Sequence, residues 1–319
     1  MATETHAPAA LRIGKTPLVR LEAFEPKPGV EIHAKLEFHN AGGSVKDRAA
    51  LAMVEDGQRR GLLGPGQVLL DATSGNTGIS YAMLGAARGF LVRLCVPANV
   101  TRERRQMLEA YGADLVLTDP MDGSDGAIQE ARRIYAADPD RYFYPDQYSN
   151  DANWRAHYDT TGVEILEQTG GAVTHFVAGL GTAGTLMGVA RFLDEQKPDV
   201  KIWAVEPPAG EMVDGLKNFD EGFTPPIFTD NDGPTLLDRK MIVRPKESIE
   251  WVRRLSDVGV FAGISSGAAM AGAAKCAGIV DEGVIVTLLA DGGWKYLSTG
   301  AWTDDIDTVV ERAKKTIYF

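Results

Sequence analysis

Short apolar runs alternate with longer segments of helical period along most of the chain. The runs at residues 68–72, 90–96 and 115–118 have the length and composition of buried strands. Residues 79–88 and 101–111 place apolar side chains at helical spacing, and the Arg and Glu side chains of the second segment are expected to form a solvated face. This alternation predicts an α/β fold with a mostly parallel sheet.

A second series of the same kind follows Asp146. Its predicted helices are residues 154–168, 185–196, 248–259 and 266–277, and its predicted strands are residues 175–178, 202–205 and 284–289. Residues 219–234 are rich in Asp, Pro and Gly and are predicted to form a long surface loop. With 319 residues, of which 44% are hydrophobic, the chain is long enough for two lobes.

The charge balance and the cysteines narrow the function classes. A net charge of -11 argues against nucleic acid or an anionic membrane surface as the main partner, because both would be repelled. No apolar run reaches the roughly 18 residues of a membrane span, and Met1 to Lys15 lack the apolar stretch of a signal peptide, so a cytoplasmic protein is expected. Cys95 and Cys276 have neither metal-binding nor redox spacing, so buried thiols and no metal site are expected.

Three glycine-rich turns carry the candidate chemistry. In the first, residues 40–48, Lys46 follows a glycine pair and opens a predicted helix at residues 46–60. A cation is electrostatically unfavourable at the N-terminus of a helix. A lysine at this position is explained when its amine must have a lowered pKa, as that of a Schiff-base lysine does. An ordinary surface lysine is the alternative.

The second turn, residues 73–78, joins a predicted strand to a predicted helix and contains Thr73, Ser74, Asn76 and Thr77. Short hydroxyl and amide side chains beside the N–H groups of a helix start suit a carboxylate. A capped turn without a ligand is the alternative.

The third turn, residues 179–185, has the pattern Gly-x-Gly-x-x-Gly, and Glu206 ends the next strand. This arrangement fits a dinucleotide-binding fold, in which the acid would bind a ribose. Thr182 and Thr185, together with backbone N–H groups, would also saturate a single phosphate monoester. The turn alone therefore leaves an NAD-dependent oxidoreductase and a phosphate-bearing cofactor open.

Taken together, these segments resemble the fold-type II pyridoxal-phosphate enzymes, specifically the cysteine synthase and cystathionine β-synthase family. The resemblance runs from Gly-Lys-Thr-Pro-Leu at residues 14–18 to Asp-Gly-Gly-Trp-Lys-Tyr-Leu-Ser-Thr at residues 291–299. It implies two open, twisted α/β lobes, similar to the tryptophan synthase β subunit. Residues 1–37 and 149–319 would form a large lobe that binds pyridoxal phosphate, and residues 38–148 a small, mobile lobe that binds the substrate.

By this resemblance Lys46 is the Schiff-base lysine, and Asn76 hydrogen-bonds the ring oxygen of the cofactor. Ser265, in a fourth polar segment at residues 263–268, looks like the partner of the pyridine nitrogen, with a helix-capping serine as the alternative. The expected phosphate loop is Gly181, Thr182, Ala183, Gly184 and Thr185, and the expected grip on the substrate carboxylate is Thr73, Ser74, Asn76, Thr77 and Gln147. A neutral serine at the ring nitrogen makes the cofactor a weaker electron sink, which favours loss of a β-substituent over transamination.

The resemblance implies a β-replacement that forms L-cysteine. O-acetylserine or O-phosphoserine would lose its β-substituent to give an aminoacrylate, and sulfide or another sulfur donor would then add, with Lys46 moving the Cα proton. Because Lys46 would transfer the Cα proton, His157 and His175 are not expected to act as a general acid or base. The family also implies a homodimer and, as partners, a serine acetyltransferase or a sulfur-carrier protein. Cystathionine β-synthase chemistry, with homocysteine as the nucleophile, and the NAD-dependent oxidoreductase are the alternatives.

Individual stretches resemble different members of the family. Asn-Ala-Gly-Gly-Ser at residues 40–44 replaces the usual Asn-Pro-Thr-Gly-Ser and is more similar to cystathionine β-synthase. Residues 218–223 and 293–297 are more similar to B-type cysteine synthases, some of which prefer O-phosphoserine. Lys217 is at a position where its cation could bind the phosphate of the substrate. A solvated surface lysine is the alternative.

Overall fold

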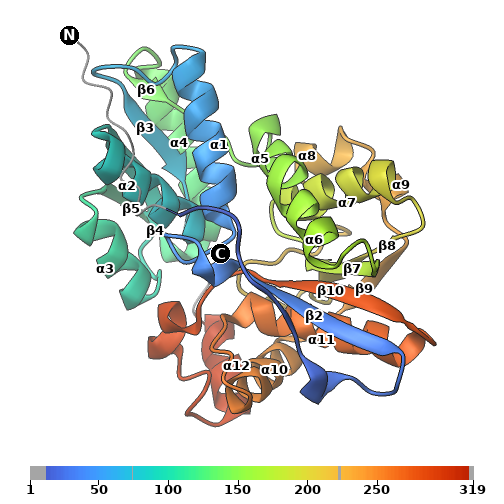
Figure 1. The fold of residues 1–319 in the computed structure, drawn as a ribbon. Coiled ribbons are helices and arrows are strands. Elements are labelled where there is room, and N and C mark those ends of the chain that lie inside the picture. Colours follow the sequence, from blue (N-terminus) through green and yellow to red (C-terminus); the bar gives the residue numbers. More distant parts are fainter. Residues whose placement is uncertain (1–11, 74, 222–223, 316–319) are drawn as a thin grey trace.

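The computed structural model describes residues 12–73, 75–221 and 224–315. Its helices and strands form two units that lie side by side, each built around its own sheet (Figure 1). The smaller sheet has the strand order β5-β4-β3-β6 and is parallel throughout. Its strands are β3 (Val68–Ala72), β4 (Leu91–Pro97), β5 (Asp114–Thr118) and β6 (Tyr142–Phe143).

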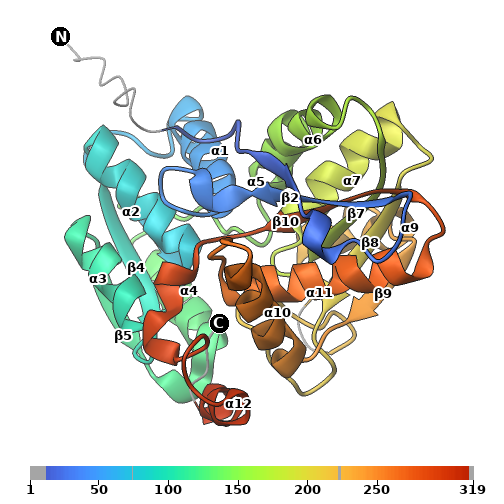
Figure 2. The ribbon, with the colours of Figure 1, turned by 60° about the horizontal axis from the view of Figure 1, so that its bottom comes forward.

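The larger sheet has the strand order β1-β2-β10-β7-β8-β9. Its strands are β1 (Leu18–Arg20), β2 (Val30–Leu36), β7 (Val173–Gly179), β8 (Lys201–Glu206), β9 (Arg239–Ile242) and β10 (Gly283–Leu289). All neighbours are parallel except β1, which runs antiparallel to β2. Because β2 pairs with β10, residues 18–36 join a sheet made mostly from the second half of the chain (Figure 2).

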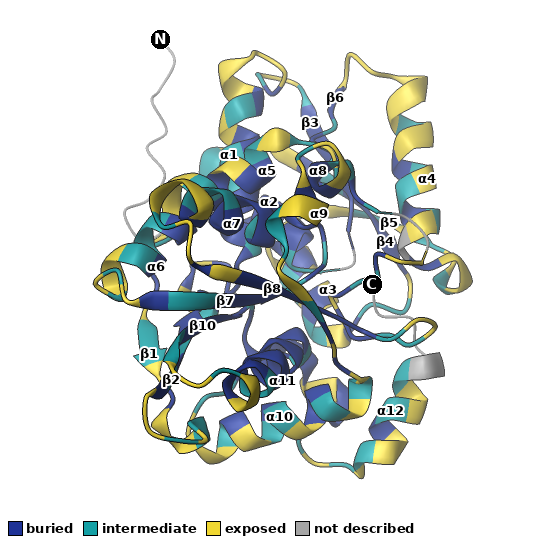
Figure 3. Ribbon diagram, turned by 90° about the vertical axis from the view of Figure 1, so that its right-hand side faces the viewer, coloured by how far each residue is buried: buried dark blue, intermediate teal, exposed yellow. Residues whose placement is uncertain are grey.

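Helices cover both faces of the smaller sheet, so β3, β6 and most of β4 are buried, whereas the edge strand β5 is partly exposed and the outer faces of the helices are exposed (Figure 3). Leu69 packs with α1 and α2, whereas the next residue, Leu70, packs with α4, because successive side chains of a strand point to opposite faces. The helices of this unit are α1 (Lys46–Arg59), α2 (Asn76–Arg88), α3 (Arg102–Ala110) and α4 (Gly123–Ala137). Burial of both faces explains why the strands are continuous apolar runs.

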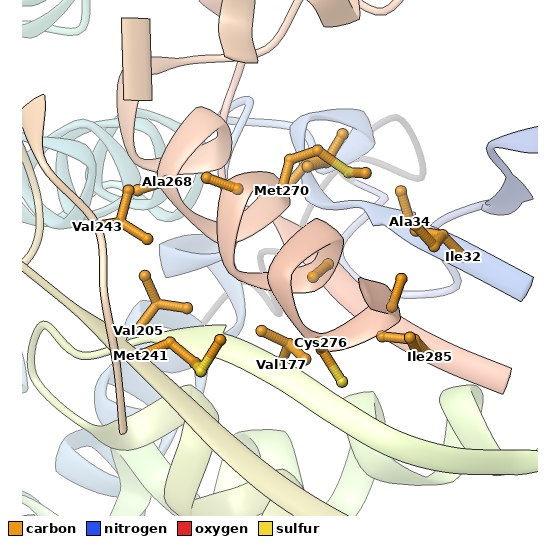
Figure 4. Close-up of a cluster of buried hydrophobic side chains, with 14 of the residues drawn as sticks. Ile32, Ala34, Val177, Val205, Met241, Val243, Ala268, Met270, Cys276 and Ile285 are labelled. Carbon is orange, nitrogen blue, oxygen red and sulfur yellow. The ribbon is translucent and has the colours of Figure 1, made fainter. Parts of the chain in front are cut away.

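The larger sheet is covered in the same way. Phe176 packs toward α7, and the next residue, Val177, packs toward α11 (Figure 4). One face carries α5 (Asp151–Ala156), η4 (His157–Gly162), α6 (Val163–Gln168), α7 (Gly184–Gln196), α8 (Pro226–Thr229) and α9 (Gly233–Leu236), and the other carries α10 (Pro245–Asp257) and α11 (Ile264–Ile279). The remaining helices are α12 (Ile306–Lys315), which packs on α10, and the 3-10 turns η1 (Glu22–Phe24), η2 (Glu37–His39), η3 (Pro120–Asp122) and η5 (Gly293–Thr299).

Helix α11 lies between the larger sheet and α10 and is buried along most of its length. Small residues make this close packing possible. A Cβ at Gly272 would lie 2.3 Å from Cγ2 of Val205, and a Cβ at Gly267 would lie 2.1 Å from the carbonyl oxygen of Ser248. The small-residue character of residues 266–277 is therefore a consequence of contact on both sides of the helix.

The α/β class and the mostly parallel sheets predicted from the sequence are confirmed. The segment 154–168 is helical as predicted, but its middle widens into the π-helical turn η4. Both cysteines are buried and unbonded, as expected. Within the described part of the chain, every helix is too short or too polar to cross a membrane.

The prediction of a surface loop at residues 219–234 is wrong for much of the segment. It contains α8 and the start of α9. Phe219, Ile227 and Phe228 are buried in the core cluster beside α7, and the two phenylalanine rings meet edge to face at 5.1 Å. These apolar side chains are few among Asp, Pro and Gly, so the local composition concealed their burial.

Candidate active site

A pocket between the two units collects most of the predicted site residues. Its lining includes Lys46, Thr73, Asn76, Thr77, Gln147, Gly181, Thr182, Thr185, Lys217 and Ser265. Ala183 and Gly184 lie in the same turn as Thr182 but are not part of the lining. Ser74 lies outside the described residues. The structure thus brings together turns that are far apart in the sequence.

Four helices begin at this pocket, and each contributes at least one of its first two residues to the lining. These residues are Lys46 in α1, Asn76 in α2, Thr185 in α7 and Ser265 in α11. Helices α2 and α7 start here because they follow parallel strands, whose carboxyl ends lie at one edge of a sheet. The first N–H groups of a helix carry positive partial charge, so four such ends favour an anionic ligand.

Lys46 is the lysine at the start of α1, and it lines the pocket. Its side chain is partly buried, and burial lowers the pKa of the amine, while the carboxylate of Asp291 opposes this shift. No residue in the described part of the chain forms a hydrogen bond or ion pair with its Nζ. An unpaired amine of lowered pKa suits nucleophilic attack on a carbonyl carbon, which distinguishes Lys46 from an ordinary surface lysine.

The turn before α7 leaves its N–H groups available. Ala183 has a left-handed backbone, with φ 68°, and no side chain caps the helix. A Cβ at Gly181 would lie 2.7 Å from the carbonyl oxygen of Gly215, so the two backbone segments approach closely only because residue 181 is glycine. The uncapped N–H groups and the hydroxyls of Thr182 and Thr185 together form a set of donors for one tetrahedral anion.

The turn before α2 is held by its own side chains. Thr73 Oγ1 accepts hydrogen bonds from the backbone N–H groups of Gly75 and Gly78, at 3.2 and 3.3 Å. Thr77 Oγ1 donates to Gln147 Oε1 at 2.7 Å, although 70 residues separate the two. The N-cap residue of α2 is Gly75 and has no side-chain cap, but Thr73 accepts from N–H groups at the start of this helix and so stiffens the turn beside the pocket.

Sequence reasoning missed two charged residues that hold Asn76. Lys295 Nζ donates to Asn76 Oδ1 at 2.7 Å, and Asn76 Nδ2 donates to Asp291 Oδ2 at 2.8 Å. Asp291 and Lys295 are both fully buried. Burial lowers the pKa of Lys295 to about 8 and raises the pKa of Asp291. The charges within the otherwise uncharged segment 291–299 were the one local signal that could have indicated them.

The expectation that α3 turns its charged residues to solvent is wrong for Arg104. Its side chain is only 3% exposed and lines the pocket. The guanidinium pairs with Asp214 at 2.7 Å and stacks over the ring of Tyr296 at 4.5 Å from the centroid. Asp214 and Tyr296 also line the pocket. The neighbouring sequence gives no indication that Arg104 is buried, because its ionic partner lies 110 residues away in the sequence.

Lys217 and His157 lie on different sides of the turn before α7. Lys217 lines the pocket, with Nζ 5.1 Å from the centre of the Tyr148 ring, and burial lowers the pKa of its amine. His157 is buried behind the turn, with Nε2 3.3 Å from Thr185 Oγ1. Burial lowers the pKa of His157, so the ring is neutral near pH 7. Lys217 can therefore contact a ligand in the pocket directly, whereas His157 contacts Thr185 of the turn through Nε2 and Thr161 through Nδ1, at 2.9 Å.

Glu206 and His175 are absent from the described lining of the pocket. Glu206 Oε2 accepts a hydrogen bond from the backbone N–H of Phe219 at 3.1 Å, so Glu206 connects the end of β8 to the segment around Phe219. His175 lies in β7, with its ring edge against Trp203. The ribose-binding role considered for Glu206 has no support in this geometry.

Residues 9–291 match the sequence profile of the family described as pyridoxal-phosphate dependent enzyme. The chain belongs to this family of pyridoxal-phosphate-dependent enzymes. It is 46% identical over 301 residues to a cysteine synthase of Aquifex aeolicus, covering 92% of this chain and 91% of the relative. It is 41% identical over 294 residues to cysteine synthase B of Escherichia coli, covering 92% and 95%. The crystal structure of a cysteine synthase from Entamoeba histolytica has a TM-score of 0.87 to it at 32% identity, covering 98% of this chain and 97% of that one.

The donor set of the pocket fits the cofactor of a pyridoxal-phosphate-dependent enzyme. The uncapped start of α7 and the hydroxyls of Thr182 and Thr185 suit a phosphate, and the unpaired amine of Lys46 suits an aldehyde. The hydroxyl of Ser265 lines the pocket, and the cap of α11 is Gly263, so the alternative of a capping serine is wrong. These residues would hold the phosphate, the aldehyde carbon and the ring nitrogen.

Proposed function

We propose that this enzyme is a cysteine synthase, which forms L-cysteine by β-replacement from an O-activated serine and sulfide or another sulfur donor. The observation that carries the proposal is the unpaired amine of Lys46 in a pocket where four helices begin, in a chain whose relatives are cysteine synthases. O-acetylserine and O-phosphoserine are the candidate substrates. Each brings an anionic carboxylate that the helix starts can bind.

Lys46 is proposed to move the proton. Pyridoxal phosphate, when bound, supplies an electron sink for negative charge at the substrate Cα. The Nζ of Lys46 takes the Cα proton and later returns it, and the pKa lowered by burial keeps part of the amine neutral for this task. Ser265 offers a neutral hydroxyl to the ring nitrogen, so the electron sink stays weak and loss of the β-substituent is favoured.

The turn before α2 is proposed to bind the substrate carboxylate. The residues assigned to this grip are Thr73, Ser74, Asn76, Thr77 and Gln147, and those within the described chain line the pocket. Carboxylate binding would draw residues 38–148, as a small mobile lobe, against the large lobe of residues 1–37 and 149–319. Closure would keep water from the reacting carbon.

Lys217 supports O-phosphoserine as a substrate. Its amine lines the pocket and can pair with a phosphate on the substrate oxygen. O-acetylserine carries no charge at that position, so it would not need this lysine.

The variant Lys46→Ala tests the proposal. We expect cysteine formation from O-acetylserine or O-phosphoserine with sulfide to fall about 1000-fold or more, because the proton-moving group is lost. The matched control is Lys201→Ala, which removes an exposed lysine paired with Asp238 at 3.2 Å and should keep wild-type turnover. Visible absorption of the purified proteins reports cofactor binding in both. Wild-type turnover by the Lys46 variant would contradict the proposal.

Four further expectations belong to the proposal. Serine with homocysteine should react far more slowly than the O-activated serines with sulfide, and the opposite order would favour cystathionine β-synthase chemistry. A homodimer is expected, and light scattering during size-exclusion chromatography measures it. A cytoplasmic location and association with a serine acetyltransferase or a sulfur-carrier protein stay predictions, which cell fractionation and pull-down from the native host address.

A further inference from the structure

The side-chain amide of Asn76 lies between two opposite charges. Lys295 Nζ donates to its Oδ1 at 2.7 Å, and its Nδ2 donates to Asp291 Oδ2 at 2.8 Å. We propose that Lys295 and Asp291 are positioning residues, which hold the Asn76 amide in one orientation so that its remaining N–H group serves the cofactor ring oxygen. The inference rests on the proposed function, because the ring oxygen belongs to the cofactor of that function, and on the family resemblance, which gives the hydrogen bond to this oxygen to Asn76.

The two charges decide the orientation electrostatically. Rotating the amide by half a turn would place its NH2 group against the ammonium of Lys295 and its carbonyl against the carboxylate of Asp291, and both contacts would be repulsive. The observed hydrogen bonds use one of the two amide hydrogens. Since Asn76 lines the pocket, the second hydrogen is available to a ligand there.

The charged pair is itself held rigidly. Lys295 is fully buried and donates a second hydrogen bond to the carbonyl oxygen of Gly42 at 2.9 Å. Asp291 accepts a hydrogen bond from the hydroxyl of Tyr296 at 2.7 Å, and its backbone forms a bridge with Ser44. Gly42 and Ser44 precede α1, whereas the charged residues follow β10, so this group of contacts joins the two units.

Protonation of Lys295 should control the arrangement. Burial lowers the pKa of Lys295 to about 8, although Asp291 and Asp47 of α1 oppose the shift, and Arg104 of α3 adds to the lowering. Below this pKa the ammonium excludes the rotated amide. Above it the neutral amine can accept as well as donate, so one of the two repulsive contacts that exclude the rotated amide is lost, and only the contact between its carbonyl and the carboxylate of Asp291 still opposes rotation.

A pH titration of visible absorption tests the inference on the purified holoenzyme. Wild type between about pH 6.5 and 9.5 should show a spectral change with a midpoint near pH 8, because the hydrogen bond to the cofactor weakens as Lys295 loses its proton. Lys295→Arg should keep the low-pH spectrum throughout, because a guanidinium stays charged. Lys295→Met should show the high-pH spectrum throughout.

Three outcomes would overturn the inference: a wild-type spectrum that does not change near pH 8, a step near pH 8 that persists in Lys295→Arg, or one that persists in Lys295→Met. Wild type and the Arg variant decide the matter even when the Met variant does not fold, and circular dichroism checks folding at each pH. A protein without visible absorption would overturn the proposed function and this inference together. A coloured protein without the step would overturn this inference alone.

Discussion

Lys46, Lys217 and Lys295 differ in role because their surroundings differ. Burial lowers the pKa of all three amines. The Nζ of Lys46 faces the pocket without a partner in the described part of the chain, whereas that of Lys295 is bonded to Asn76 and Gly42. An unpaired amine can react, and a bonded amine can only position its acceptors. Neither the residue type nor its place at a helix start after two glycines excluded a surface lysine, and the family resemblance gave Lys46 its proposed role.

The leaving group is a question at the scale of a single residue. We expect Lys217→Ala to lower kcat/KM for O-phosphoserine about 10-fold to 100-fold, the effect of one lost charged hydrogen bond, and to leave kcat/KM for O-acetylserine nearly unchanged. Steady-state assays with both substrates measure the ratio. Lys217→Arg keeps the charge and should keep the preference. An unchanged ratio in the Ala variant would remove Lys217 from the leaving-group site.

At the scale of elements, one buried ion pair connects α3 to the segment after β8. Arg104 and Asp214 have side chains that are 3% and 6% exposed, and their 2.7 Å contact lies beside Tyr296 in the pocket. A buried charge that loses its partner is costly, because the interior cannot solvate it as water does. The pair should therefore fix how α3 sits against the larger unit.

We expect Asp214→Asn to destabilise the protein by about 3 kcal/mol, since Arg104 would stay charged and buried without its carboxylate. Urea unfolding measures the change. The double variant Arg104→Met with Asp214→Leu should be less destabilised than the sum of its two single variants. Asp307→Asn, in the exposed pair with Lys246, is the control and should have little effect. Equal stability of Asp214→Asn and this control would contradict the assignment.

Two of the elements that the sequence analysis did not predict, α4 and β9, have weak local patterns. Helix α4 opens with glycine and polar residues typical of a turn, and its buried face rests on small residues such as Ala127 and Ala131. Strand β9 has only four residues, with charged ones at its start. Both are stabilised by packing against neighbours that are already in place, so their own sequences carry little signal.

At the scale of the whole molecule, a buried ionic cluster joins α1 to the other unit. Arg48 pairs with Glu37 at 2.8 Å and with Glu164 of α6 at 2.7 Å, and Lys35 pairs with Glu164 at 2.7 Å. Burial opposes ionisation of Glu164, but the hydrogen bonds and charge of Arg48, together with the hydrogen bond from Lys35, lower its pKa to about 2. Acid should therefore weaken the contact between the units.

The pH dependence of stability follows from this shift. A carboxyl whose pKa is lowered in the folded state contributes stability above its usual pKa of 4.5 and loses it as the pH falls toward about 2. We expect Glu164→Gln to be less stable than wild type at neutral pH by about 2 kcal/mol, allowing for solvent screening. The gap should narrow by about 1 kcal/mol on acidification to about pH 3.5. Urea unfolding at the two pH values measures it, with the exposed Glu250→Gln as control; a gap independent of pH would contradict the assignment.

Local sequence was sufficient for the α/β class, for Lys46 at a helix start, and for the polar turns at residues 73–78 and 179–185. Each of these features is encoded within about a dozen neighbouring residues, in which a strand, a turn and a helix start follow one another. The roles given to the turns came from their resemblance to a known family. Tertiary structure alone brought Asn76 to Asp291 and Lys295, which lie 215 and 219 residues away. Hydrogen bonds over such separations and the pKa shifts caused by burial depend on how the two units pack, and no local pattern encodes that packing.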